Sequence, residues 1–519
     1  MNMLPIIAFL SFLFIIFYLY KNSEIVNKRK LVVFTALLIV IFIIVNIIYY
    51  HRSKPPEQQF RLLICPFSFA GDISPENRAL FQYVPYFASN QIYRSVTDKA
   101  VVIPFESVHK TFDLDSLSNA AYLSKIVTLT GTTHFVTGEI DKLDTNSFRL
   151  HLSMGEPDVE HQAVEFGFQR DEFPQMLPEV SKAVMNFMNI PGKSIFDAPI
   201  SSSIDHLQHF MAAFQLYLAE QFNEAIEELA KAIAADSTNS AAHLLAAETY
   251  YAQAVKEHAK NEKSAIREFS NTRFFLDEAI VRDSLNDENY RLLGEYYIFN
   301  ERWARAEEAL YKAWQLNSNN PRIYPPYARF HEFRYQKIGF QNEEQLYERA
   351  IYLNPFYEKA YLLLSSHHVF NNSRDKGMQV LHDYLQLNPE SIRAMMALTK
   401  IHIVRNEVMP ALNLLEKVIK LDPDRADAFY NLGIVYYNTE DFDNAKRFFK
   451  RAIEISNHLN SYLYLAYINE KEGDKEQAIA YLRKRIHYKT GFDDEFAEVA
   501  REHLYKLIHQ DSTKGKQND

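Results

Sequence analysis

The sequence is poor in cysteine and glycine. Its 519 residues include one cysteine, Cys65, and 13 glycines. A single cysteine excludes a disulfide framework within the chain. So few glycines argue against a turn-rich all-β protein and against glycine-rich phosphate loops, and they favour long helices.

Apolar and aromatic residues are abundant instead. The chain is 47% hydrophobic and 14% aromatic, with 32 Tyr and 38 Phe, and its formal net charge is -10. Such a chain can bury large cores, which excludes wholesale disorder. The length suffices for about three or four domains.

Two uncharged runs occupy the first fifty residues, at 3–20 and 31–50. As a helix the second run is about 30 Å long, the thickness of the hydrocarbon core of a bilayer. The alternative for the first run is a cleaved signal peptide, but no Lys or Arg precedes it and no small-residue cleavage site follows it. The sequence predicts two transmembrane helices, within an anchor spanning residues 1–56.

Basic residues around these runs predict their orientation. The loop at 21–30 carries four basic side chains against one acidic one, and the segment after the second run carries three basic side chains. The positive-inside rule places the loop in the cytoplasm and residues 51–519 outside it. The difference of one charge leaves the opposite orientation as an alternative.

A small α/β domain is predicted at residues 57–190. Strands are expected at 61–67, 100–103, 133–139, 147–153 and 163–169, and helices at 75–94, 117–128 and 173–189. The order β-α-β-α-β-β-β-α indicates a sheet with helices packed on it. A linker at 191–205 follows, and its serine run is typical of a flexible joint.

Two short motifs give this domain a family resemblance. The first strand ends in Pro66-Phe67, and residues 129–138 read Leu-Thr-Gly-Thr-Thr-His-Phe-Val-Thr-Gly. The domain resembles the TolB-like amino-terminal domain, to which the curli-secretion and flagellar outer-membrane lipoprotein families have related domains. The resemblance implies a bacterial envelope protein with an assembly or sensing module and no active site. Together with the two spans it places the chain in the bacterial inner (cytoplasmic) membrane, as a multi-pass protein with extracytoplasmic soluble domains.

The rest of the chain repeats with a period of 34 residues, marked by Pro355, Pro389 and Pro423. The pattern resembles that of tetratricopeptide (TPR) repeats. Its register gives eight units, which start near residues 206, 240, 287, 321, 358, 392, 426 and 459. A capping helix at about 493–509 closes a superhelix over 206–509, and 510–519 form a polar tail. The fold class is therefore mainly α.

The eighth position of every unit holds a small residue, which predicts close approach of the two helices of a unit. These residues are Ala213, Ala247, Gly294, Ala328, Ser365, Thr399, Gly433 and Ala466. The aromatic residues then fill the layers between helices.

First-helix positions of such repeats line the concave face of the superhelix. The side chains predicted to bind a partner there are Arg291, Arg322, Arg329, Lys359, Arg393, Lys400, Tyr430 and Tyr437. This mainly cationic stripe suits an acidic peptide, a carboxy terminus or an anionic polymer. Glu288, Glu295 and Glu332 interrupt the stripe, so an intramolecular salt-bridge surface is the alternative. The apolar residues at 207, 210, 214 and 217 extend the predicted face onto the first unit.

A subset of the family clamps a terminal carboxylate with Lys and Asn at fixed positions. Asn431 stands at one such position, but Met396 stands where a Lys is required. The resemblance therefore implies no such clamp in this chain.

Motifs for catalysis, metals and cofactors are missing from the sequence. It contains no zinc-protease, Cys-x-x-Cys, nucleophile-elbow or calcium-loop pattern. His206 and His209 are expected at the surface rather than at a metal, and Cys65 in a buried strand. We predict no enzyme, no cofactor, no metal and no nucleic-acid partner.

Two functions follow from this organisation. The first is a membrane-anchored scaffold that binds a protein or peptide in the concave groove and contacts the lipid bilayer through its amino-terminal helices. The cationic stripe predicts an acidic partner. The alternative is a sensory or regulatory subunit whose α/β domain binds a small ligand or partner and controls the repeats. An enzyme with an unrecognised site is a third, less favoured reading.

Overall fold

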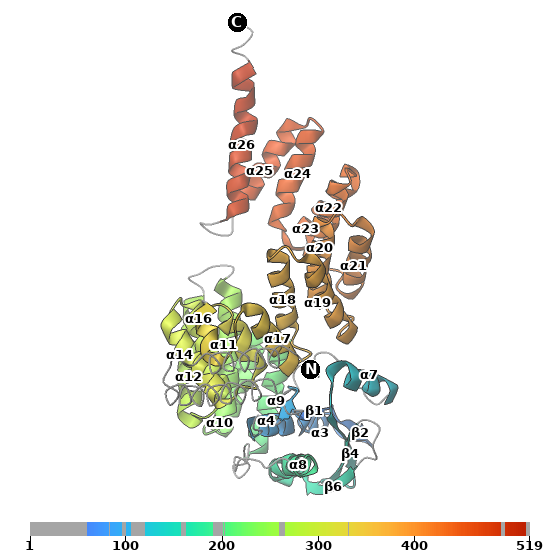
Figure 1. The fold of residues 1–519 in the computed structure, drawn as a ribbon, viewed down its shortest axis with the longest axis vertical. Coiled ribbons are helices and arrows are strands. Elements are labelled where there is room, and N and C mark those ends of the chain that lie inside the picture. Colours follow the sequence, from blue (N-terminus) through green and yellow to red (C-terminus); the bar gives the residue numbers. More distant parts are fainter. Residues whose placement is uncertain are drawn as a thin grey trace, which may run out of the picture. The chain divides into compact units, whose positions relative to one another are not determined.

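The structure, a computed structural model, describes residues 60–514 except 83, 96–99, 105–119, 157–161, 190–200, 202, 259–264, 331 and 489–493. The two predicted membrane spans and most of the linker lie outside these residues. Among the helices described, none is both long and apolar enough to cross a bilayer. The described chain is mainly helical, with a small sheet near its amino-terminal end (Figure 1).

The amino-terminal part is an α/β domain. Its strands are β1 (Phe60–Ile64), β2 (Ser68–Ala70), β3 (Ala100–Val102), β4 (His134–Lys142), β5 (Ser147–Gly155) and β6 (Gln162–Gln169). Its helices are α3 (Pro75–Phe81), α4 (Val84–Ser95), α7 (Ala120–Thr130) and α8 (Phe173–Phe187). The strand order is β3-β1-β4-β5-β6, and β2 also pairs with β4. β1 is parallel to β3 and β4, whereas β4, β5 and β6 are antiparallel neighbours.

The alternation of side chains in β5 shows how the sheet faces its core. Phe148, Leu150, Leu152 and Met154 are buried, while the residues between them are partly exposed. Since successive side chains of a strand point to opposite faces, one face of the sheet is apolar. α4 and α8 bury their own apolar residues in the same core.

The observed elements agree with the predicted order except at two places, both near prolines. The predicted strand at 61–67 ends at Ile64, because Pro66 lacks the N–H that a ladder requires, and β2 follows it. The predicted helix at 75–94 is two helices, and Pro85 lies in the first turn of the second one. The assignment to the TolB-like family stays a prediction.

The remaining chain forms antiparallel helix pairs. They are α9 (Ile204–Leu218) with α10 (Phe222–Ala235), α11 (Ser240–His258) with α12 (Ile266–Arg282), α13 (Asp287–Phe299) with α14 (Trp303–Leu316), α18 (Glu358–Phe370) with α19 (Arg374–Leu387), α20 (Ile392–Val404) with α21 (Val408–Leu421), α22 (Ala426–Asn438) with α23 (Phe442–Ser456), and α24 (Leu459–Lys471) with α25 (Lys475–His487). α26 (Glu495–Lys514) packs on α25. These pairs start within two residues of the predicted units.

The fourth unit departs from this pattern. Its first helix is broken into a 3-10 turn at Pro321–Ile323, α15 (Tyr324–Tyr327), α16 (Glu332–Tyr335) and a second 3-10 turn at Gln336–Ile338, before α17 (Glu343–Leu353). Pro321, Pro325 and Pro326 supply no backbone N–H, so a continuous hydrogen-bonded helix cannot form. Ala328 is nevertheless buried, as predicted for the eighth position.

Close approach at the eighth position is confirmed in the structure. A Cβ added to Gly294 would lie 2.4 Å from Cγ of Leu310, and one added to Gly433 would lie 2.5 Å from Cε1 of Phe449. Real Cβ atoms do not approach other atoms so closely, which leaves no room for any larger residue. The small residues therefore set the distance between the helices of these units.

Candidate binding surfaces on the concave face of the repeats

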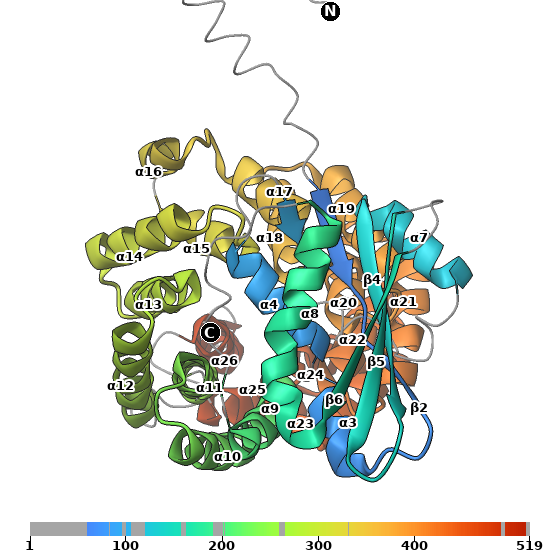
Figure 2. The ribbon, with the colours of Figure 1, turned by 90° about the horizontal axis from the view of Figure 1, so that it is seen from below.

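The concave face of the first repeat is covered by α4 of the α/β domain. Phe210 and Phe214, which the sequence assigns to an open face, are 2% and 4% exposed. The ring of Phe214 lies 4.7 Å from that of Tyr86, and the ring of Phe210 lies 6.5 Å from that of Phe87. Figure 2 shows α4 between α8 and the arc formed by α10 to α15. This part of the face is an interface within the chain.

Polar contacts extend this interface to the next repeats. Arg94, in the last turn of α4, forms an ion pair at 2.5 Å with Asp283, in the turn after α12. Asn319 donates a hydrogen bond to the carbonyl of Ala100 at 3.2 Å, and Arg61 donates one to the carbonyl of Tyr352 at 2.6 Å. The α/β domain therefore contacts the first four repeats.

Arg291 is buried beneath this interface, and its predicted role in partner binding is corrected. Its side chain is 1% exposed and forms ion pairs with Glu248, with Glu288 at 2.6 Å and with Glu295 at 3.2 Å. Burial opposes ionisation of Glu288 and Glu295, but the surrounding cations together, led by the guanidinium of Arg291, outweigh it and lower the pKa of both carboxyls. Its three carboxylate neighbours occupy this guanidinium.

Arg322 belongs to the same network, but its side chain is 38% exposed and its role in partner binding stays a prediction. It forms ion pairs at 2.7 Å with Glu248 and at 3.1 Å with Glu288. The pKa of Arg322 is raised well above its usual value because the two carboxylates outweigh the desolvation of the guanidinium. The alternative of an intramolecular salt-bridge surface thus describes the third and fourth repeats.

Asp287, the neighbour of Glu288 at the start of α13, is a buried carboxyl without a cationic partner among the described residues. It is 3% exposed, accepts a hydrogen bond from Asn320 at 2.7 Å, and has no basic side chain within ion-pair distance in the part of the chain that the structure describes. Burial, and then the charge of Glu288, raise the pKa of Asp287 to about 7. Ionised Asp287 is therefore destabilising in the folded state.

This pKa shift predicts how Asp287→Asn changes stability with pH. Unfolded Asp287 ionises near pH 4, but folded Asp287 ionises only near pH 7, so the wild type loses stability as the pH rises between these values. Asn keeps the hydrogen bond to Asn320 without the charge. We expect the variant to gain about 1–3 kcal/mol more at pH 8 than at pH 5, in urea unfolding. Asp443→Asn, at an exposed position in the first turn of α23, is the control. Equal effects of Asp287→Asn at both pH values would contradict the assignment.

Three other predicted residues form no ion pair with this network in the part of the chain that the structure describes. Arg329 is exposed and its guanidinium lies 5.6 Å from the ring of Trp303. Lys359 is exposed at the start of α18. Tyr437 packs between repeats, with its ring 5.2 Å from that of Tyr464.

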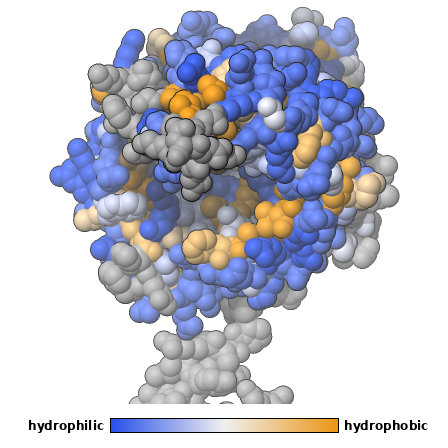
Figure 3. Space-filling model, turned by 90° about the horizontal axis from the view of Figure 1, so that it is seen from above, coloured by the Kyte–Doolittle hydropathy of each residue, from blue (hydrophilic) through white to orange (hydrophobic). Residues whose placement is uncertain are grey.

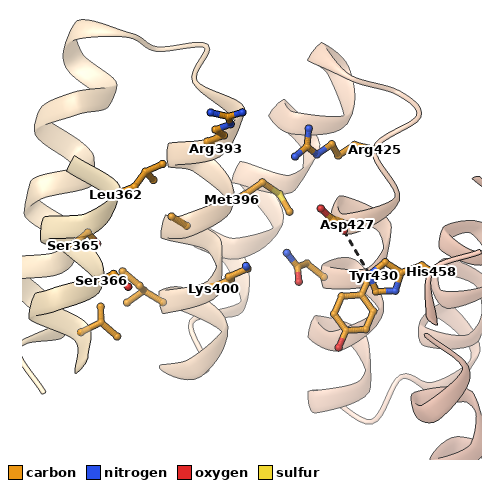
Figure 4. Close-up of a pocket in the computed structure, with 14 residues that line it drawn as sticks. Leu362, Ser365, Ser366, Arg393, Met396, Lys400, Arg425, Asp427, Tyr430 and His458 are labelled. Atoms are coloured by element: carbon orange, nitrogen blue, oxygen red, sulfur yellow. Dashed lines mark ion pairs between the residues drawn. The ribbon is translucent and has the colours of Figure 1, made fainter. Parts of the chain in front are cut away.

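A cavity, the carboxy-terminal groove, lies along α18, α20 and α22. Its volume is about 580 Å³. Figure 4 shows side chains of α18 on one side, those of α22 on the other, and those of α20 between them. The lining residues are Leu362, Ser365, Ser366, Val369, Arg393, Met396, Ala397, Lys400, Ile401, Arg425, Asp427, Tyr430, Asn431 and His458. Of the predicted residues, the groove brings together Arg393, Lys400 and Tyr430.

The groove is cationic. Arg393, Lys400 and Arg425 face a single acidic lining residue, Asp427, which gives a net charge of +2 with His458 neutral. Among the described residues no carboxylate lies within ion-pair distance of Lys400, and Arg393 is 67% exposed with its nearest carboxylate, from Glu358, at 3.6 Å. These cations remain accessible to a ligand.

Asn431 adds an unsatisfied donor to this groove. The residue is 5% exposed, and its side-chain Nδ2 has no hydrogen-bond partner in the described structure. Leaving a buried amide unpaired costs about 1–3 kcal/mol. An acceptor oxygen from a ligand in the groove would remove this cost.

Sequence reasoning missed Arg425, Asp427 and His458 as groove residues. Arg425 and His458 are the residues directly before α22 and α24, whereas the prediction used mainly helical positions. Asp427 lies 3.5 Å from His458, whose hydrogen bond lowers the pKa of the carboxyl. Extending the repeat register by one residue at its amino-terminal end would have found both N-cap residues.

Two residues singled out in the sequence are structural. Cys65 is 1% exposed, and burial raises the pKa of its thiol to about 12, so it is an unreactive apolar residue. His206 is buried rather than at the surface: its ring pairs with the carbonyl of Ala232 at 2.9 Å, and burial lowers its pKa.

The comparisons with known proteins concern the repeats. Family models of the tetratricopeptide repeat match residues 426–458 and 460–484, and a TPR repeat model matches residues 405–439. Comparison with curated protein sequences gives no match.

Two solved structures resemble the chain. The crystal structure of the APC/C hetero-tetramer Cut9-Hcn1 aligns at 15% identity and a TM-score of 0.42, over 63% of this chain and 59% of that one. The crystal structure of MamA aligns at 22% identity and a TM-score of 0.26, over 30% of this chain and 91% of that one. The family models carry the assignment: residues 405–484 contain tetratricopeptide repeats.

Proposed function

We propose that the chain is a membrane-anchored scaffold that binds an acidic segment of a protein partner in the carboxy-terminal groove. Lys400 carries this proposal, because it faces the groove without an ion-pair partner among the described residues. Arg393 and Arg425 add positive charge, and Asn431 offers a donor to a carboxylate or carbonyl oxygen.

Exposed apolar residues on helices that line the groove define the partner further. Phe370 and Val404, at the ends of α18 and α20, are 88% and 68% exposed. Figure 3 shows a mainly hydrophilic surface on which hydrophobic residues gather beside a hollow. Large exposed apolar side chains at the ends of helices that line a cationic groove favour a segment that combines carboxylates with an apolar side chain.

The membrane anchor and the envelope role belong to the same proposal. The anchor rests on the two uncharged runs and their basic loop, and the bacterial envelope on the TolB-like resemblance. On this proposal the amino-terminal helices hold the scaffold at the inner membrane, and binding proceeds without chemical turnover.

Charge reversal in the groove tests the binding proposal. Peptides selected from a random display library on the purified full-length chain are expected to be enriched in Asp and Glu. The double variant Arg393→Glu, Lys400→Glu should lower the affinity for a selected peptide by about tenfold or more in isothermal titration calorimetry. The reason is that acidic side chains of the groove then face acidic side chains of the peptide. Lys417→Glu, at an exposed position on the second helix α21, is the matched control. Unchanged affinity of the groove variant would remove the groove from the account.

The regulatory function is a second candidate because the α/β domain lies on the concave face itself. The contact between Tyr86 and Phe214 joins that domain to the first repeat. A ligand at this junction would act on both parts of the chain at once.

A further inference from the structure

A second cavity lies between part of α4 and the concave face of the first four repeats. This interdomain cavity has a volume of about 170 Å³. Drug-sized ligands occupy roughly 300–1,000 Å³, so this cavity suits a smaller molecule. Its walls come from the α/β domain on one side and from α9, α11, α13 and residues 320–322 on the other.

The walls combine aromatic rings with carboxylates. Tyr86 and Tyr93 of α4 line the cavity together with Phe214 of α9. Glu248, Asp287 and Glu288 also line it. Aromatic faces attract cations, and a carboxylate in a partly desolvated place pairs with them strongly.

The cations already in place do not neutralise these acids. Arg94 is paired with Asp283, and Arg322 with Glu248 and Glu288. Arg291 is shared by three carboxylates, and Lys359, two repeats further along the chain, acts on Glu295.

One carboxylate therefore remains in excess. The acids of this region are Asp283, Glu248, Asp287, Glu288 and Glu295, and the cations are Arg94, Arg291, Arg322 and Lys359, which is five against four. The unpaired member is Asp287, at the amino-terminal end of α13 and at the wall of the cavity. A buried carboxylate without a positive partner is costly, and a cationic ligand would supply that partner.

We propose that the interdomain cavity binds a small organic cation, an ammonium group on a short apolar body, with the ammonium at Asp287 and the body against Tyr86 and Phe214. The ligand contacts both the α/β domain and the repeats, so its binding stabilises their junction. This site is distinct from the carboxy-terminal groove, and the two are testable separately.

Isothermal titration calorimetry on the purified full-length chain tests the site with n-butylamine and 2-phenylethylamine. The alcohols 1-butanol and 2-phenylethanol are the matched neutral probes. We expect at least one amine to bind and to raise the melting temperature, while the corresponding alcohol binds about tenfold or more weakly.

Two variants locate the binding. Asp287→Asn should lower the affinity for the amine by about tenfold or more. Ala241→Trp retains Asp287, but its larger side chain, at an exposed position on the wall, should block the cavity. Asp443→Asn should bind as the wild type does. Circular dichroism confirms that each variant is folded. Absence of binding by both amines, equal binding of amine and alcohol, or unchanged binding by folded Asp287→Asn would overturn the proposal.

Discussion

Replacing Arg291 with alanine is expected to lower the free energy of unfolding by about 3–5 kcal/mol, because it leaves buried carboxylates without their cation. Glu248, Glu288 and Glu295 all pair with this guanidinium, and each is at most 19% exposed. Arg322 reaches only the first two of them. Urea unfolding at constant pH measures the change.

Arg329→Ala is the matched control for this prediction. Arg329 stands one repeat further along the chain, is exposed, and has a ring contact with Trp303 rather than a buried ion pair. Exposed charges of this kind contribute about 0–1 kcal/mol to the free energy of unfolding. If Arg291→Ala lowers the free energy of unfolding as little as Arg329→Ala does, the buried network does not stabilise the repeats.

The Phe214→Ala substitution should destabilise the junction between the α/β domain and the first repeat by about 3–5 kcal/mol. Its ring is 4% exposed and lies against Tyr86, so truncation removes apolar contacts and leaves a cavity. Because the loss falls at the junction, hydrogen exchange should quicken in α4 and α9 more than in α22.

Phe274→Ala provides the comparison for this second substitution. Phe274 lies on α12 and is 59% exposed, so its truncation should change stability by less than about 1 kcal/mol. A similar small effect for Phe214→Ala, or exchange that quickens evenly along the repeats, would show that α4 does not rest on the first repeat.

The repeat architecture could be predicted because its causes are local. Small residues at the eighth position and prolines every 34 residues act within one helix pair, so the starts of the units follow from the sequence. The fourth unit shows the limit of this reasoning. Ala328 occupies the eighth position as the repeat pattern predicts. The continuous first helix that the pattern also predicts does not form, because Pro325 and Pro326 interrupt it.

The candidate site could be predicted only where nothing else covers it. Repeat positions give the concave face, and they identified Arg393, Lys400 and Tyr430. The same positions in earlier repeats hold Arg291, which is buried among carboxylates, and Phe214, which is buried against α4. Phe214 packs equally well on a partner or on a domain of the same chain, so its sequence position cannot distinguish these cases.

The spacing of acidic residues around each basic residue distinguishes paired cations from accessible ones. Glu288 stands three residues before Arg291 and Glu295 four residues after it, and acids at such spacing pair with a basic residue within a helix. Lys400 has no acidic residue at an equivalent place in the structure, which is why it remains accessible. The interruptions of the cationic stripe thus mark the part that the chain itself occupies.

The account holds that the α/β domain occupies the concave face of the first four repeats and leaves the carboxy-terminal groove for a partner. Photo-crosslinking in the cells to which the chain is native tests this most directly, with benzoylphenylalanine at Ser366 or at Ala241. Both positions are exposed, and they line the groove and the interdomain cavity respectively. We predict adducts with a partner protein from Ser366 and only intramolecular links to α4 from Ala241. Partner adducts from Ala241 and none from Ser366 would contradict the account.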